Sequence, residues 1–237
     1  CKDIVIAAIE GSSLGTALDK AAAKKIPVNA YDRLLMDNAN VDYYATFDNY
    51  MVGTIQGTYV KDTLDLDNAA GPFNIEFTAG DPGDNNAGFF FNGAYDVLKP
   101  YIDAGKLNIV SGQNTFEQVA TPSWKTETAQ SRAENILSSY YADGTNVDVW
   151  LCSNDSTALG VENALAANYN GKLLRLFEGI LSCRAIKHEH HLVRSLRHHL
   201  HHDFLHLLQL VHQAYFVMQT TSRIYQHHLH LLNNPLL

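Results

Sequence analysis

Short apolar runs alternate along residues 1–172 with longer stretches in which apolar residues recur at helical spacing. The runs predict buried strands, because they are apolar on both faces and are bounded by turn residues. The predicted strands are Ile4–Ile9, Pro27–Tyr31, Tyr43–Phe47, Phe73–Thr78, Leu107–Ser111 and Val147–Cys152. The predicted helices are Leu14–Lys25, Val52–Leu66, Ala87–Asp103, Thr126–Tyr141 and Ser156–Asn168. This alternation predicts an α/β fold with parallel sheets.

Polar side chains follow four of the predicted strands. Open parallel sheets bind ligands just beyond the carboxyl ends of their strands, so these positions are the first candidates for a site. They are Asp32 and Arg33, Asp48 and Asn49, Asp84 and Asn86 within Gly80-Asp-Pro-Gly-Asp-Asn-Asn-Ala87, and Asn154 and Asp155 within Ser153-Asn-Asp-Ser156.

Two interpretations of these polar residues stay open. Asp48, Asp84 and Asp155 each precede a predicted helix and could serve only as N-caps. Arg33 is harder to explain in this way, because a guanidinium next to a buried strand needs a carboxylate or a polar ligand. Asp, Asn and Arg together offer the planar, bidentate hydrogen bonding that suits neighbouring sugar hydroxyls. Trp124, in a Pro-marked loop, is either packed on the next helix or free to stack on a sugar ring.

Catalytic signatures are weak in this chain. It has no nucleophile elbow, no phosphate-binding Gly-rich loop and no dinucleotide fingerprint, and none of the first 187 residues is a histidine. Paired carboxylates remain an option for acid–base chemistry, but no pair stands out. We therefore predict a binding protein that is not an enzyme and uses no cofactor or metal.

Charge and hydropathy exclude other classes of partner. The formal net charge of −8 argues against nucleic acid or an anionic membrane as the main partner. No apolar run approaches the ~20 residues of a membrane span. The cysteines, Cys1, Cys152 and Cys183, show neither metal-binding nor redox spacing.

The composition changes near Gly171. All 12 histidines lie at or beyond His188, whereas 14 of the 15 glycines lie within residues 1–172. Residues 173–237 are rich in His and Leu, in clusters such as His198-His-Leu-His-His202. Histidines at helical spacing could bind a metal. We instead interpret the tail, predicted to be helical or disordered, as an unrelated segment produced by a frameshift or a gene-model error.

Residues 2 to about 171 resemble the type I periplasmic sugar-binding proteins of ABC transporters, within them the xylose-binding and multiple-sugar-binding group. Five stretches carry the resemblance, in the order and at the spacing of the family. They are Ile26-Pro-Val-Asn-Ala-Tyr-Asp-Arg-Leu34, Tyr43-Tyr-Ala-Thr-Phe-Asp-Asn49, Gly80–Ala87, Val97-Leu-Lys-Pro-Tyr-Ile-Asp-Ala-Gly-Lys106 and Ser153-Asn-Asp-Ser-Thr-Ala158.

The resemblance implies two α/β lobes that close on a sugar. Residues 1–47 would be a remnant of the N-terminal lobe, 48–172 the C-terminal lobe and 173–237 a tail foreign to the family. Arg33 would bind the sugar from the first lobe, with Asp32 as a weaker candidate. Asp84, Asn86 and Asn154 would bind hydroxyls from the second lobe, and Trp124 would stack on the ring.

The implied function is capture of a monosaccharide of the xylose, galactose or glucose type for uptake by an ABC transporter. The implied partners are the sugar and the membrane permease, and the implied location is the periplasm or the cell surface. A sugar-sensing domain of a transcriptional regulator or a chemoreceptor partner is the alternative. The family pattern has ligand-bearing segments before Cys1 and after Gly171 that find no match. We therefore expect a monomeric fragment that binds sugar weakly or not at all.

Overall fold

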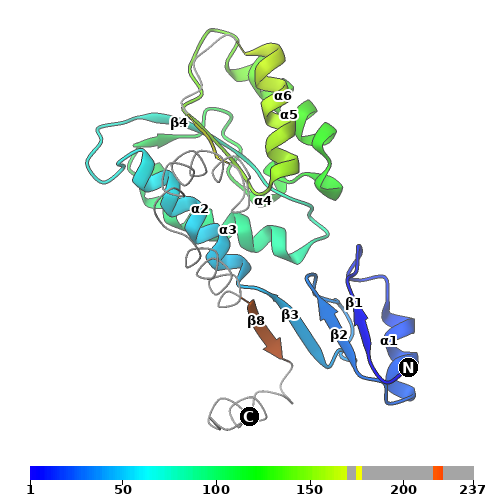
Figure 1. The fold of residues 1–237 in the computed structure, drawn as a ribbon. Helices are drawn as coiled ribbons and strands as arrows, with labels where there is room; N and C mark the ends of the chain where they lie inside the picture. Colours follow the sequence, from blue (N-terminus) through cyan, green and yellow to red (C-terminus); the bar gives the residue numbers. More distant parts are fainter. Residues whose placement is uncertain (170–174, 178–215, 221–237) are drawn as a thin grey trace, which may run out of the picture. The chain divides into compact units, whose positions relative to one another are not determined.

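The computed structural model describes residues 1–169, 175–177 and 216–220, the last two groups by their backbone alone (Figure 1). The chain divides into two compact units. Unit 1 comprises Cys1–Asp48 and His202–Leu237, and unit 2 comprises Asn49–His201. Each unit has its own sheet.

Unit 1 is built on a sheet with the strand order β1-β2-β3-β8. Its elements are β1 (Ile4–Ile6), α1 (Gly15–Ala23), β2 (Val28–Tyr31), β3 (Tyr43–Phe47) and β8 (Phe216–Thr220). The first three strands are parallel, and β8 pairs antiparallel with β3. Leu18 and Ala21 of α1 belong to one buried cluster with Val28, Ala30 and Tyr44 of the sheet. The amphipathic helix α1 thus covers one face of this sheet.

Unit 2 is built on a parallel sheet with the strand order β5-β4-β6-β7. Its strands are β4 (Phe73–Thr78), β5 (Leu107–Asn108), β6 (Val149–Cys152) and β7 (Arg175–Phe177). Its helices are α2 (Asn49–Thr63), α3 (Asn85–Asp103), α4 (Phe116–Val119), the 3-10 turn η1 (Pro122–Trp124), α5 (Thr126–Tyr140) and α6 (Asp155–Asn168).

Both faces of the unit 2 sheet are buried, and β6 shows how the sequence achieves this. Val149 and Leu151 pack in a cluster with residues of α2 and α3, whereas Trp150 and Cys152 pack in a second cluster with residues of α5 and α6. Successive side chains of a strand point to opposite faces, so an uninterrupted apolar strand needs helices on both sides. The helix pairs α2–α3 and α5–α6 provide this cover (Figure 1).

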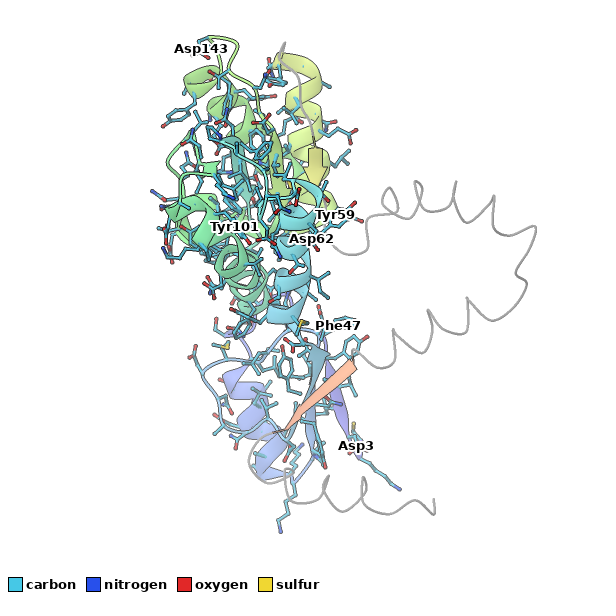
Figure 2. All side chains as sticks on the ribbon, turned by 90° about the vertical axis from the view of Figure 1, so that its left-hand side faces the viewer. Asp3, Phe47, Tyr59, Asp62, Tyr101 and Asp143 are labelled. Atoms are coloured by element: carbon cyan, nitrogen blue, oxygen red, sulfur yellow. The ribbon has the colours of Figure 1, made fainter. Side chains whose placement is uncertain are left out.

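The pair α2–α3 packs closely because glycines stand where the helices meet. A Cβ added at Gly53 would lie 2.1 Å from the Phe90 carbonyl oxygen, and one added at Gly93 would lie 2.1 Å from the Tyr50 carbonyl oxygen. Polar contacts lie at the other ends of these helices. The Tyr101 hydroxyl on α3 donates to the carboxylate of Asp67, just after α2, and Tyr101 also lies near Asp62 of α2 (Figure 2).

The α/β class and the six strands and five helices predicted for residues 1–172 are confirmed, with shorter ends at β1, β5 and β6. Two short elements, α4 and η1, were not predicted. The prediction of a helical or disordered tail is wrong at residues 175–177 and 216–220, which form β7 and β8, because each pairs with a strand of a folded unit. The histidine clusters lie outside the described residues. None of the described helices is long and apolar enough to cross a membrane.

Candidate functional site

The carboxyl end of β4 leads into Gly80–Ala87 and the start of α3. Asp84 is the N-cap of α3, since its Oδ1 accepts a hydrogen bond of 3.1 Å from the backbone N–H of Asn86. Asp84 and Asn86 are nearly buried, with exposed fractions of 6% and 4%. The capping interpretation of Asp84 is therefore confirmed, and the same turn brings two polar side chains to the strand end.

A second segment runs beside this turn. The Ala79 N–H donates to the Val119 carbonyl at 2.8 Å, and the Thr121 N–H donates to the Gly80 carbonyl at 2.8 Å. These bonds place η1 next to the end of β4. The indole Nε1 of Trp124 then donates to Asp84 Oδ2 at 3.1 Å.

Asn154 follows the neighbouring strand β6 and caps α6. Its Oδ1 accepts a hydrogen bond of 2.9 Å from the Thr157 N–H. The Ser156 hydroxyl lies 3.1 Å from Asn154 Oδ1 and 3.1 Å from the Trp124 carbonyl oxygen. Asp155 is the first residue of α6, so Asn154 rather than Asp155 is the cap.

The four candidates of unit 2 thus belong to one hydrogen-bonded series. Asn49 Nδ2 donates to Asn86 Oδ1 at 2.9 Å. From Asn86 the series continues through Asp84 to Trp124, and from there through Ser156 to Asn154. The sequence predicted Asn86, Asp84, Trp124 and Asn154 as site residues but not Ser156, which connects Trp124 to Asn154. Nothing in the local pattern around Ser156 shows which segment it meets.

A partly buried cation holds the strand end in place. Arg132 of α5 donates through Nη1 to the Phe77 carbonyl at 2.8 Å and through Nη2 to Gln113 Oε1 at 2.6 Å, and its Nε donates to the Gln118 carbonyl at 3.2 Å. Burial lowers the pKa of Arg132, and the nearby Glu76 carboxylate opposes this shift. Arg132 therefore ties β4 to the segment that leads to Trp124. Sequence reasoning did not identify it.

Glu76 lies within β4 and is fully buried. Its Oε1 accepts from the Ser111 N–H at 2.9 Å and from the Tyr141 hydroxyl at 2.8 Å, and its Oε2 accepts from the Ser111 hydroxyl at 2.6 Å. Burial raises the pKa of Glu76, while these hydrogen bonds and the Arg132 charge oppose the rise. A glutamate inside an apolar strand indicates a carboxylate with hydrogen-bond partners, because burying a carboxylate without partners costs too much free energy.

In unit 1, Asp32 and Arg33 lie directly after β2, as predicted. Asp32 has a left-handed backbone with φ of 66°. Its carbonyl oxygen accepts hydrogen bonds from the Tyr44 hydroxyl at 3.1 Å and the Thr46 hydroxyl at 3.0 Å. Arg33 Nη1 donates to the Ile9 carbonyl. The strand end in unit 1 therefore presents a carboxylate and a guanidinium from a turn held by β3.

These residues favour binding of a neutral polyhydroxylated ligand over metal chemistry. Within the described parts of both units, no three His, Cys, Asp or Glu side chains are grouped as a metal ion needs. Carboxylate and amide groups beside an indole can accept and donate to hydroxyls while the ring covers an apolar face.

Comparison with known proteins gives a match over residues 1–186 to the family described as "Periplasmic binding protein domain". The multiple sugar-binding periplasmic receptor ChvE of Rhizobium radiobacter is 50% identical over 164 residues, which is 69% of this chain and 46% of that protein. The D-xylose-binding periplasmic protein of Escherichia coli is 35% identical over 164 residues, 69% of this chain and 45% of that protein. The chain therefore spans about half the length of these curated relatives.

Among solved structures, an ABC transporter solute-binding protein of Clostridium phytofermentans with bound β-D-glucose is 59% identical to this chain. The two superpose with a TM-score of 0.75, over 79% of this chain and 58% of the other. The resemblance drawn from the sequence motifs is thus confirmed at the level of family and fold.

Proposed function

The chain belongs to the periplasmic binding protein domain family, a family of binding proteins rather than enzymes, and from this premise we propose that it captures a monosaccharide. The observation that carries the proposal is the hydrogen-bonded series from Asn86 through Asp84 and Trp124 to Asn154. It gathers planar hydrogen-bonding groups and one aromatic ring at the carboxyl ends of β4 and β6, where open parallel sheets bind ligands.

Each candidate has a chemical role in this proposal. Asn86 and Asn154 exchange hydrogen bonds with ring hydroxyls, because an amide can both donate and accept. Trp124 stacks on the apolar face of the sugar ring. Asp32 and Arg33 contribute from residues 1–47, which we assign to the N-terminal lobe, and residues 48–172 form the C-terminal lobe.

A sugar of the glucose or xylose type is the proposed ligand. The support comes from the bound β-D-glucose of the 59% identical structure and from the names of the two curated relatives. The names of the two curated relatives support a periplasmic location. The 59% identical structure is of an ABC transporter solute-binding protein, which supports delivery of the sugar to the permease of such a transporter. Loss of radiolabelled sugar uptake on deletion of the gene is the expected cellular result, and unchanged uptake would contradict the transport role.

Isothermal titration tests the binding site with four sugars: D-glucose, D-xylose, D-galactose and L-arabinose. The sugar concentration is raised to about 100 mM, so that a Kd of about 1 mM is still measurable. The sequence motifs left weak binding and no binding open, and of these two outcomes we propose weak but saturable binding of at least one sugar. Asn86→Ala and Asn154→Ala should each weaken it about tenfold, as expected for one lost hydrogen bond of about 1.4 kcal/mol. Arg33→Ala tests the ligand assigned to unit 1 in the same way.

Asn85→Ala is the matched control, because Asn85 is the exposed neighbour of the buried Asn86 at the start of α3. It should leave the affinity unchanged. Folded protein that shows no saturable binding with any of the four sugars contradicts the proposal. Equal losses in Asn85→Ala and Asn86→Ala would contradict the assignment of the site.

A further inference from the structure

The indole of Trp124 lies directly on Gly80. A Cβ added at Gly80 would lie 1.9 Å from Cη2 of Trp124 and 2.2 Å from both Cζ2 and Cζ3. The backbone of Gly80 is not in the left-handed region, so another residue could adopt its conformation. Glycine is therefore needed here for space: any side chain would push the indole away.

The indole is held on its other sides as well. Its Nε1 donates to Asp84 Oδ2 at 3.1 Å, and the Ser156 hydroxyl lies 3.1 Å from the Trp124 carbonyl oxygen. The Phe90 ring meets it edge-on, with ring centroids 6.4 Å apart. These contacts leave Trp124 only partly buried.

The backbone that carries the indole is itself unusual. Ser123 and Trp124 have φ of 57° and 55°, in the left-handed region that costs non-glycine residues energy. Two such residues in succession persist only where the surrounding contacts determine the conformation. The contacts from Gly80, Asp84 and Ser156 are those that do so here.

We propose that Gly80, Asp84 and Ser156 are positioning residues that hold the indole of Trp124 in one orientation before any ligand arrives. The inference deepens the proposed function and rests on it, since Trp124 is the ring expected to cover a sugar. A ring already fixed in its bound orientation loses no rotamer freedom on binding, which favours affinity.

This role changes the interpretation of Asp84. Its Oδ1 is engaged by the Asn86 N–H and its Oδ2 by the Trp124 indole. A carboxylate has about four lone-pair sites, so it can still accept a hydroxyl. Asp84 then acts on the sugar both directly and through the orientation of Trp124.

The fluorescence of Trp124 in the complete chain, measured without sugar, tests the proposal. Trp150 is fully buried, so quenching by iodide reports on Trp124, and Trp124→Phe identifies its share of the emission. Gly80→Ala should shift the Trp124 emission to the red and raise its iodide quenching constant. Gly88→Ala is the matched control, because a Cβ at Gly88 meets no atom within 4 Å, and it should change neither quantity.

Ser156→Ala and Asp84→Ala give the same readout if Gly80→Ala does not fold. Both should raise the quenching constant. Ser156→Thr keeps the hydroxyl and should give the quenching constant of the wild type. Ser138→Ala removes a hydroxyl that is bonded within α5 and should leave the quenching constant unchanged. Unchanged emission and quenching in folded Gly80→Ala, or in both Ser156→Ala and Asp84→Ala, would overturn the proposal.

The outcome is separable from that of the sugar titrations. If the fluorescence changes as expected and no sugar binds, the positioning contacts stand and the proposed function fails. If sugar binds while the fluorescence of these variants equals that of the wild type, the proposed function stands and the positioning role fails. If both hold, Ser156→Ala should also weaken sugar binding while Ser138→Ala does not.

Discussion

Glu76 and Tyr141, 65 positions apart in the sequence, are joined by a hydrogen bond of 2.8 Å from the Tyr141 hydroxyl to the buried Glu76 carboxylate. Burial raises the pKa of both groups. The pair therefore links β4 to the end of α5. The buried Glu76 carboxylate needs hydrogen bonds from both Ser111 and Tyr141 to carry its charge in the folded state.

The first prediction concerns the pH dependence that Glu76 creates. Its pKa is raised above the ordinary value of 4.5, so the folded protein binds the proton more tightly than the unfolded chain. The stability that protonation contributes is fully present below the unfolded pKa and is lost as pH rises through the folded pKa. The free energy of unfolding of the wild type should thus fall relative to that of Glu76→Gln as pH rises through this window.

Urea unfolding of the wild type and of Glu76→Gln at a series of pH values from about 4 to 7 measures the difference between their free energies of unfolding. For one titrating group this difference changes by at most about 1.4 kcal/mol per pH unit. The amide introduced by Glu76→Gln can retain the contacts, because the Ser111 hydroxyl can accept as well as donate. A difference that is independent of pH would show that the pKa of Glu76 is not raised.

A second prediction concerns Arg132, whose guanidinium bridges the end of β4 and the segment before Trp124. Arg132→Met should lower the free energy of unfolding by about 3 kcal/mol or more, because it removes several charged hydrogen bonds, among them the bond to the carbonyl of the buried Phe77. Arg132→Lys should lose less, since it keeps the charge but not the planar fork. Lys99→Met, at an exposed ion pair with Asp103, is the control and should remain close to the wild type.

A third prediction compares two glycines in neighbouring helices. Gly53→Ala should destabilise unit 2 by about 1–3 kcal/mol, because its Cβ would meet the Phe90 backbone at 2.1 Å. Gly88→Ala in α3 has open space and should stabilise it by about 0.5–1 kcal/mol through helix propensity. Thermal or urea unfolding measures both, and changes of the same sign would contradict the close packing of α2 on α3.

A fourth prediction tests the left-handed turn before Trp124. Ser123→Gly should change the free energy of unfolding by less than about 0.5 kcal/mol, since relief of strain at φ of 57° offsets the extra freedom of the unfolded chain. Ser138→Gly makes the same change inside α5 and should cost about 0.5–1 kcal/mol. Equal losses for the two variants would mean that Ser123 carries no strain.

Much of this molecule could be predicted from local pattern. Val149–Cys152 is recognisable as a doubly buried strand because its residues are all apolar, and the structure divides them between two helix pairs. Asp84 and Asn154 could be placed at strand ends, because the alternation of strands and helices defines where each strand stops. Short pieces such as α4 and η1 were missed, because they have too few residues to show a period.

The sequence by itself determined where the longer strands and helices of residues 1–172 lie, and which polar groups follow those strands, since both depend on neighbours a few positions away. Only the tertiary structure decided the partners. The hydrogen bond from Trp124 to Asp84 spans 40 positions. The indole lies on Gly80 only once the segment before Trp124 runs along the end of β4. The physical reason is that parallel strands are joined by long crossovers, so the neighbours at a shared sheet edge come from distant parts of the chain.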